Sequence, residues 1–273
     1  SVDNVSVRLA DPDRSVNNNG LAVYGTVTKT AVETSAELMA YSGFSSANYL
    51  EQPHNADLDF GTGDFSIMGW SYIATGQENT NPYVLRSNDV DIYNYILFQA
   101  LVAQTLSFQL RGDAGIVTLT STGLHPLDSW FHVCALRRSG VMHIYLNGVD
   151  TGSDGGASGY DLTSPNADHV LRFGLTNKNQ RGDMALWRIS ATAPSAAQLD
   201  KIYEDEKHLF RDNALAVLSD DSVTALSHDP ITDLLYVGGP SGMTTISGIT
   251  PVSRDTTAVS TFISVVDGME IKQ

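Results

Sequence analysis

Short alternating segments, each bounded by turn residues, fill the chain from Leu38 to Phe210 at intervals of about ten residues. Residues 64–73 carry apolar side chains on both faces of such a segment, which predicts a strand buried on both sides. Residues 130–136 and 141–146 predict a hairpin, and the following Asn147-Gly148 pair tolerates the positive φ angles of a tight turn. Neighbouring strands therefore pair locally, and we expect an antiparallel β-sandwich.

The acidic residues are mostly of the kind found in turns. The chain has 24 Asp against 7 Glu and 5 Lys, together with 23 Gly. Glu and Lys favour helices, whereas Asp and Gly favour turns, so the composition excludes a helical bundle.

One helix is nevertheless expected near the end of this region. Ser195 and Gln198 have the spacing of a capping box, in which each side chain bonds the backbone of the other. An apolar stripe at helical spacing follows, formed by Leu199, Ile202, Tyr203, Leu209 and Phe210. We expect this helix to lie on the sandwich and close the domain.

Three regions of the chain differ in pattern. Residues 1–37 are poor in large apolar side chains, so we expect an amino-terminal arm with one strand near residues 21–28. Residues 38–210 hold the sandwich. Residues 211–273 predict a meander of three short strands that resembles one blade of a β-propeller. A sheet this small is marginal alone, so we expect it to pack on the sandwich, on another copy or on a longer protein.

The charge of the chain argues against two classes of partner. The 273 residues hold 16 Lys and Arg against 31 Asp and Glu, a formal charge of −15, which disfavours nucleic acid and anionic membranes. No stretch approaches the roughly 20 apolar residues of a membrane span. Cys134 is the only cysteine, so neither an internal disulfide nor a cysteine zinc site is expected.

Three segments carry motifs with a common resemblance. The first is 48–70, with a glycine turn before Phe65 and Trp70; the second is 130–148, with a Trp-Phe-His-Val strand and a hairpin ending in Tyr-Leu-Asn-Gly; the third is 186–195. Together they resemble the laminin G-like or pentraxin-like branch of the concanavalin A-like jelly rolls. The resemblance covers residues 38–210 and implies an antiparallel jelly-roll β-sandwich.

A second resemblance covers the end of the chain. The helix running into residues 204–210 and the meander after it look like the carboxy-terminal region of tail or fibre proteins of tailed bacteriophages. This resemblance implies a virion-surface protein, extracellular once released, that contacts other virion proteins and forms a homo-oligomer, expected to be a trimer. Because residue 1 is Ser rather than Met, we expect a processed chain or a piece of a longer protein.

Calcium is the one metal that the resemblance implies. Family members often hold it through a carboxylate in the final strand, but the expected Asp-Glu pair falls here on Ala185-Leu186. Loop acids are alternative oxygen ligands. The candidates are Asp57, Asp59 and Asp183, with Asp150 and Asp154 as further loop acids. The competing interpretation is that they are solvated turn residues. No other cofactor is implied.

Glycoside hydrolysis is the enzymatic alternative, because wider relatives of the jelly roll are glucanases. That chemistry needs two carboxyl groups roughly 5 to 9.5 Å apart. Asp57-x-Asp59 and Asp89-x-Asp91 have a suitable spacing, but no Glu accompanies them, and the acids at 204–206 fall on the expected helix. We therefore expect no enzyme.

The other reactive side chains have structural interpretations. Alternation places His132 on the face of Trp130 and Cys134, which indicates a packed histidine and a small buried thiol. His125 and His228 are expected in turns. Two Arg-Gly-Asp triplets, at 111–113 and 181–183, are interpreted as ordinary turn chemistry.

A binding or building module remains. Aromatic rings cover the apolar face of a sugar while amides and carboxylates take its hydroxyls. The candidate ligand-binding residues are Tyr83, Asn88, Asp89, Asp91, Tyr93, Tyr95, Tyr160, Asp161, Asn177 and Asn179. We expect a non-catalytic virion adhesion protein that binds a host cell-surface glycan. The alternative is an assembly or capsid decoration protein without a glycan ligand, which a large exposed apolar patch would favour.

Overall fold

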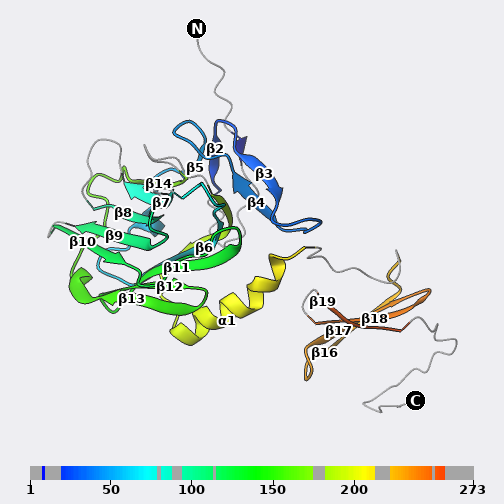
Figure 1. The fold of residues 1–273 in the computed structure, drawn as a ribbon. Coiled ribbons are helices and arrows are strands. Elements are labelled where there is room, and N and C mark those ends of the chain that lie inside the picture. Colours follow the sequence, from blue (N-terminus) through cyan, green and yellow to red (C-terminus); the bar gives the residue numbers. More distant parts are fainter. Residues whose placement is uncertain are drawn as a thin grey trace, which may run out of the picture. The chain divides into compact units, whose positions relative to one another are not determined.

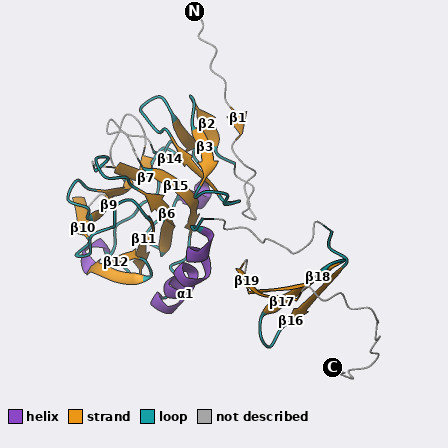
Figure 2. Ribbon diagram, turned by 45° about the vertical axis from the view of Figure 1, so that its right-hand side comes forward, coloured by secondary structure: helices purple, strands orange, loops and turns teal. Residues whose placement is uncertain are grey.

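The computed structural model describes residues 8–9, 20–78, 81–87, 94–112, 115–174, 182–212, 222–247 and 250–255. The chain divides into two compact units (Figure 1). The first comprises Ser1–Val32 and Leu38–Lys207, and the second comprises Glu33–Glu37 and His208–Gln273. Figure 2 shows that strands dominate the described parts of both units.

The first unit is an antiparallel jelly-roll sandwich of two sheets, as predicted. One sheet has eight strands in the order β1 (Arg8–Leu9), β2 (Ala22–Tyr24), β5 (Tyr49–Gln52), β14 (Val170–Phe173), β7 (Asn81–Ser87), β8 (Ile96–Ala100), β9 (Leu106–Gly112) and β10 (Gly115–Thr120). The other has seven, in the order β13 (Val149–Asp154), β12 (Val141–Leu146), β11 (Trp130–Arg138), β6 (Phe65–Tyr72), β15 (Asp183–Ser190), β4 (Met39–Ser42) and β3 (Thr28–Ala31).

The main core lies between these sheets. Along β6, Phe65 and Ile67 face it, while Met68 belongs to a smaller cluster on the outer face. The strand is therefore buried on both sides, as its apolar pattern predicted. The predicted hairpin is also confirmed, since β11 pairs with β12 and the Asn147-Gly148 turn, with both φ angles positive, leads into β13.

A bulge in β15 brings Trp187 into the core. The register with β6 shifts between Ala185 and Arg188, and Leu186 takes a φ of 50°. The indole then lies over Gly69, where an added Cβ would be 2.5 Å from the ring. Its ring centroid is 5.0 Å from that of Tyr83 on the opposite sheet. Glycine at position 69 therefore makes room for the largest side chain between the sheets.

The amino-terminal segment differs from the expected separate arm. The strand predicted near residues 21–28 is divided into β2 and β3, which extend one sheet each by pairing with β5 and β4. The carbonyl of Val32 also accepts a hydrogen bond from Trp130 Nε1 at 2.9 Å. These residues thus belong to the sandwich because its sheet edges supply the partners that a lone strand needs.

The predicted helix is confirmed as α1 (Ala196–Glu206), with the complete capping box of Ser195 and Gln198. Its Leu199 packs on Met68, Cys134, Leu136 and Tyr145, on the outer face of the seven-stranded sheet. The described residues also form three short 3-10 turns: η1 (Ala56–Leu58), η2 (Gly155–Ala157) and η3 (Lys207–Leu209), which follows α1 directly. In the part of the chain that the structure describes, no helix has the length and apolar character to cross a membrane.

The second unit contains a sheet of four strands rather than the predicted three. The order is β16 (Ala225–Asp229), β17 (Leu234–Gly239), β18 (Gly242–Ser247) and β19 (Thr250–Asp255). The fourth strand contains Pro251, which argues against a central strand but is tolerated here because β19 lies at the edge.

Candidate functional site

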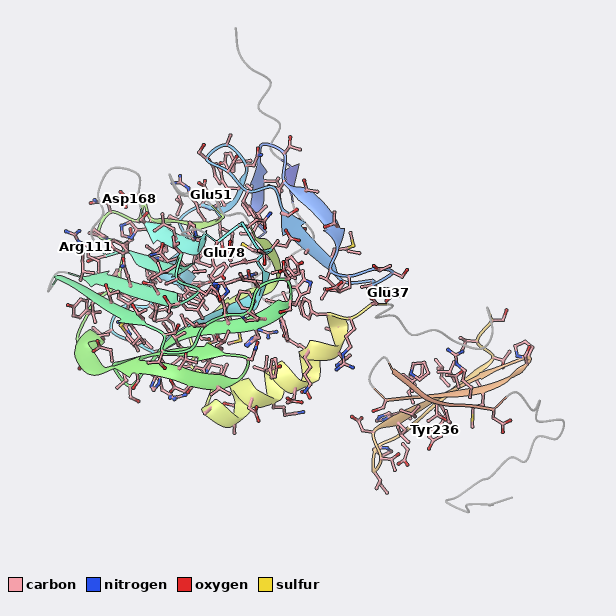
Figure 3. All side chains as sticks on the ribbon, viewed as in Figure 1. Glu37, Glu51, Glu78, Arg111, Asp168 and Tyr236 are labelled. Carbon is pink, nitrogen blue, oxygen red and sulfur yellow. The ribbon has the colours of Figure 1, made fainter. Side chains whose placement is uncertain are left out.

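The connections at one end of the sandwich meet around a buried arginine, and we call this region the Arg86 end. Strands β6 and β14 begin there, and β7 and β11 finish there. Figure 3 shows Arg111 and Asp168 on this side of the sandwich. The described connections are 53–64, 94–95, 139–140 and 155–169.

An ion pair between Arg86 and Asp59 lies at the centre of this end. Asp59 Oδ1 also accepts a hydrogen bond from the backbone N–H of Ser164 at 3.0 Å. Arg86 Nη1 donates to the carbonyls of Leu162 at 2.8 Å and of Asn94 at 3.3 Å. The Arg86 side chain is 1% exposed, so this pair fastens three connections from inside the protein.

A second layer of hydrogen bonds shapes the connection at 160–169. Asn94 Nδ2 donates to the carbonyl of Thr163 at 3.0 Å. Ser164 Oγ accepts from the backbone N–H groups of Asp168 and His169 at 3.1 and 3.3 Å. These bonds close a compact turn that carries the buried His169 ring.

Arg137, on β11, fixes the neighbouring connection. Its guanidinium donates to the carbonyls of Gly63 at 2.8 Å, Tyr160 at 2.7 Å and Gly61 at 2.7 Å. The same group lies 5.3 Å from the ring centroid of Phe65. Because the side chain is fully buried, its hydrogen bonds position backbone rather than meeting solvent.

Two predicted ligand-binding tyrosines lie at the Arg86 end, on opposite faces of the eight-stranded sheet. The carbonyl of Tyr95 accepts from the backbone N–H of Arg111 at 3.0 Å. The Tyr160 ring lies beside Gly112, where an added Cβ would be 3.1 Å from it. Both side chains are half-buried, but Tyr160 packs against the main core, whereas the Tyr95 hydroxyl donates to Gln109 Oε1 at 3.1 Å on the outer face of the sheet.

Asp161, next to Tyr160, is the third predicted residue here. Its Oδ1 accepts from the backbone N–H of Thr163 at 2.9 Å. Hydrogen bonds from Thr163 lower the pKa of Asp161, and Arg137 contributes in the same direction. The connection at 155–169 therefore places the half-buried Tyr160 ring beside the exposed Asp161 carboxylate.

Tyr83 needs a correction, because it was predicted to bind a ligand. It lies in β7 and is completely buried, with Phe98 and Trp187 against its ring. Burial raises the pKa of its hydroxyl. The sequence gives β7 no clean alternation around Pro82, where the register with β8 shifts. The remaining candidates, Asn88, Asp89, Asp91, Tyr93, Asn177 and Asn179, lie outside the described residues.

The predicted calcium ligands do not form one site. Asp183 pairs with Tyr72 at the far end of β6, whereas Asp57 and Asp59 lie before its first residue. Eight residues of strand separate the ends, about 25 Å. Asp59 is already bound to Arg86, and burial raises the pKa of Asp183. Within the described ranges, no group of three His, Cys, Asp or Glu is placed to hold a metal.

The other loop acids and the helix acids have structural partners. Asp150 pairs with His143 Nδ1 at 2.8 Å, and Asp154 accepts from Gly156 N at 2.7 Å. Glu206 Oε2 accepts from Trp70 Nε1 at 2.8 Å, and Glu206 Oε1 lies 2.7 Å from Arg188 Nη2. The acids at 204–206 lie on α1, as predicted, and Asp89-x-Asp91 falls outside the described residues.

Sequence reasoning missed the buried polar residues that hold the connections at the Arg86 end in place: Arg86, Asn94, Arg137, Ser164 and His169. One signal was available for Arg86. It stands two residues after Val84 in a strand, in phase with a core position, and an arginine there requires a buried partner. The partner, Asp59, is 27 residues away, so no local pattern identifies it.

Comparisons with solved structures show the same architecture in binding domains of clostridial toxins. The binding domain of Paraclostridial Mosquitocidal Protein 1 aligns with a TM-score of 0.59 and 12% identity, over 98% of this chain and 71% of that one. The receptor binding domain of botulinum neurotoxin C/D mosaic serotype aligns with a TM-score of 0.58 and 16% identity, over 92% and 63%.

A third such structure is the binding domain of botulinum neurotoxin DC in complex with rat synaptotagmin II. It aligns with a TM-score of 0.55 and 14% identity, over 89% of this chain and 61% of that one. The chain thus spans less than two thirds of the length of both botulinum domains. No curated protein matches the sequence significantly. At these identities, the structural likenesses establish the fold alone.

The sequence itself places the chain in a family. Residues 44–200 match the concanavalin A-like lectin/glucanases superfamily, and this range includes the hairpin of β11 and β12 and the start of α1. The match covers more than half of the chain and agrees with the jelly-roll sheets. The chain therefore belongs to the concanavalin A-like lectin/glucanases superfamily.

Proposed function

We propose that this chain is a non-catalytic adhesion protein of a virion, a bacteriophage tail fibre or surface module that binds a host cell-surface carbohydrate at the Arg86 end. The observation that carries this proposal is the placement of the half-buried Tyr160 ring next to the exposed Asp161 carboxylate. Arg86 and Arg137 hold the connection that carries both residues, through hydrogen bonds to the carbonyls of Leu162 and Tyr160. The titles of the similar solved structures describe binding or receptor-binding domains, which supports a binding role.

The chemistry of this end suits a sugar. A pyranose stacks its apolar face on an aromatic ring, and its hydroxyls donate to carboxylate or carbonyl oxygens. Tyr160 supplies the ring, and the lowered pKa of Asp161 favours a charged acceptor beside it. The braced backbone reduces the ordering that binding would require. The virion context rests on the resemblance to phage tail and fibre proteins.

Glycan-array binding of the intact chain tests the proposal. Tyr160→Leu keeps apolar volume but removes the ring, and it is expected to weaken binding at least tenfold, about 1.4 kcal/mol. Tyr236→Leu, in the second unit (Figure 3), is the control and should bind like the original chain. Adding a calcium chelator should leave binding unchanged, because Asp57, Asp59 and Asp183 do not converge. Absence of any glycan bound above background would refute the carbohydrate proposal.

The glucanase alternative draws no support from the described acids. The residues at 204–206 bind basic and indole groups or lie on the exposed face of α1, and Asp59 is neutralised by Arg86. We expect no sugar release from β-glucans or bacterial exopolysaccharide. Release that disappears in Asp57→Asn or Asp89→Asn would reverse this conclusion.

One observation supports assembly as a second function. Three apolar side chains at the opposite end of the sandwich are more than half exposed: Val102, Leu124 and Val149. Backbone hydrogen bonds from His125 to Gln104 and from Thr122 to Thr151, both 2.8 Å, join their connections. Exposed apolar side chains on connections that are joined by hydrogen bonds suit a contact with another virion protein. Replacing all three by Ser should abolish incorporation into particles, whereas Ile116→Ser, another exposed apolar position, should not.

A further inference from the structure

His169 is buried at the Arg86 end, next to several charged side chains. Its side chain is 1% exposed, and neither ring nitrogen has a hydrogen-bond partner among the described residues. The charged and titratable groups that face it are Arg86 on β7, Asp59 and His54 on the connection before β6, and Asp168 beside it. A proton on this ring would place a second cation next to a buried guanidinium.

Hydrogen bonds connect the backbone of His169 to Arg86 and its partners. The backbone N–H of His169 donates to Ser164 Oγ, and the backbone N–H of Ser164 donates to Asp59. Asp59 in turn holds Arg86, whose Nη1 holds the carbonyl of Leu162, next to Asp161. The backbone of His169 is therefore linked by hydrogen bonds, through Ser164, Asp59 and Arg86, to the residue that follows Asp161.

We propose that His169 is an acid-sensitive latch of the Arg86 end, whose neutral ring lets the turn at 164–169 close on Arg86 and whose protonation opens that turn. This inference rests on the binding function proposed above and adds its regulation: ligand binding weakens reversibly as the solution becomes acidic. Asp168 is 41% exposed, its Oδ1 lies 4.0 Å from Nε2 and accepts from Ser164 Oγ in the closed turn, so opening the turn releases this carboxylate to pair with the charged ring.

The direction of the effect follows from the neighbours. Burial lowers the pKa of His169 first, and the Arg86 guanidinium lowers it next, against a smaller opposing effect of Asp168 and Asp59; His54 also lowers it. In the open turn the pKa returns toward the ordinary 6.5. The closed form is thus fully favoured above pH 6.5 and is lost as the pH falls below it. One proton taken up on opening raises the open fraction by up to about tenfold per pH unit.

Hydrogen exchange of the intact chain tests the latch without any ligand. After correction for intrinsic exchange, amides of residues 160–169 should open up to about tenfold more for each pH unit below about 6.5. His169→Gln cannot titrate and should remove this response. His143→Gln, on β12 and paired with Asp150, should keep it. If His169→Gln loses the sandwich by circular dichroism, His169→Asn provides the same comparison.

Two results would overturn the latch: exchange at 160–169 that does not change with pH, or a pH response that persists in both uncharged variants. Repeating the glycan array at about pH 7.5 and about pH 5.5 separates the latch from the function. Opening without any glycan bound at either pH supports the latch and overturns the carbohydrate function. Equal glycan binding at both pH values, with opening observed, overturns the claim that the latch regulates binding.

Discussion

Single residues determine how Trp187 packs between the two sheets. Trp187 reaches the core only because β15 bulges at Leu186 and because position 69 has no side chain. Its Nε1 donates to the carbonyl of Trp70 at 3.1 Å, which fixes the indole over β6. The bulge and the glycine therefore act together.

Gly69→Ala is expected to lower the free energy of unfolding by about 1–3 kcal/mol, because the new methyl group would lie 2.5 Å from the Trp187 ring. Urea unfolding followed by tryptophan fluorescence measures this, since all three Trp lie in the first unit. Gly155→Ala is the control, because an added Cβ there meets nothing within 4 Å. An unchanged midpoint for Gly69→Ala would contradict this account of the packing.

His132 gives the sandwich an acid-sensitive stability. Burial lowers its pKa to about 3, and Arg188 contributes in the same direction. The unfolded chain takes up the proton near the ordinary pKa of 6.5, so stability present above that pH is lost as the pH falls toward 3. His132→Phe should reduce the pH slope of the unfolding free energy by up to about 1.4 kcal/mol per unit. An identical slope in urea titrations below pH 6.5 would show that His132 carries no such effect.

At the scale of elements, α1 is the clearest case in which a local sequence signal and a tertiary contact agree. The capping box fixes where the helix begins. Its position on the sheet depends on Tyr203, which stacks on Trp70 at 5.7 Å, and on Glu206, which binds the same indole. The sequence predicted the first feature, whereas the second joins residues 136 positions apart.

Ser195→Ala is expected to lower the unfolding free energy by about 0.5–2 kcal/mol, because it removes the acceptor for Gln198 N. Ser195→Asp restores an acceptor and should recover most of that loss. The measurement is again urea unfolding by tryptophan fluorescence. Equal destabilisation by both substitutions would mean that the cap is not the cause.

At the scale of the whole molecule, the second unit exposes several large apolar side chains to solvent. Large apolar side chains are exposed there at Val223, Leu226, Ile231, Met243 and Val252. We predict a homo-oligomer, expected to be a trimer, with this unit at the interface. Light scattering should show the oligomer at tens of micromolar, roughly where a moderate interface is filled. An intact chain that stays monomeric there would contradict the prediction.

Removing the second unit tests the same prediction from the other side. Deletion of residues 208–273 should leave a folded, monomeric sandwich. Deletion of residues 1–36 would remove β2, β3 and the Val32 contact with Trp130. We therefore expect that second deletion to destabilise the sandwich, which thermal unfolding would show.

The sequence alone determined the features that depend on neighbouring residues: the β-sandwich, the hairpin of β11 and β12, the Asn147-Gly148 turn and the start of α1. Periodicity, turn chemistry and capping act over a few positions, so they are visible in one chain. Tertiary structure decided the rest. It buried Tyr83, moved Asp183 to the far end from Asp59, drew the amino-terminal strands into the sheets, and paired Asp59 with Arg86. Each of these outcomes depends on which distant strands become neighbours, and alternation along one strand gives its two faces but not its partners.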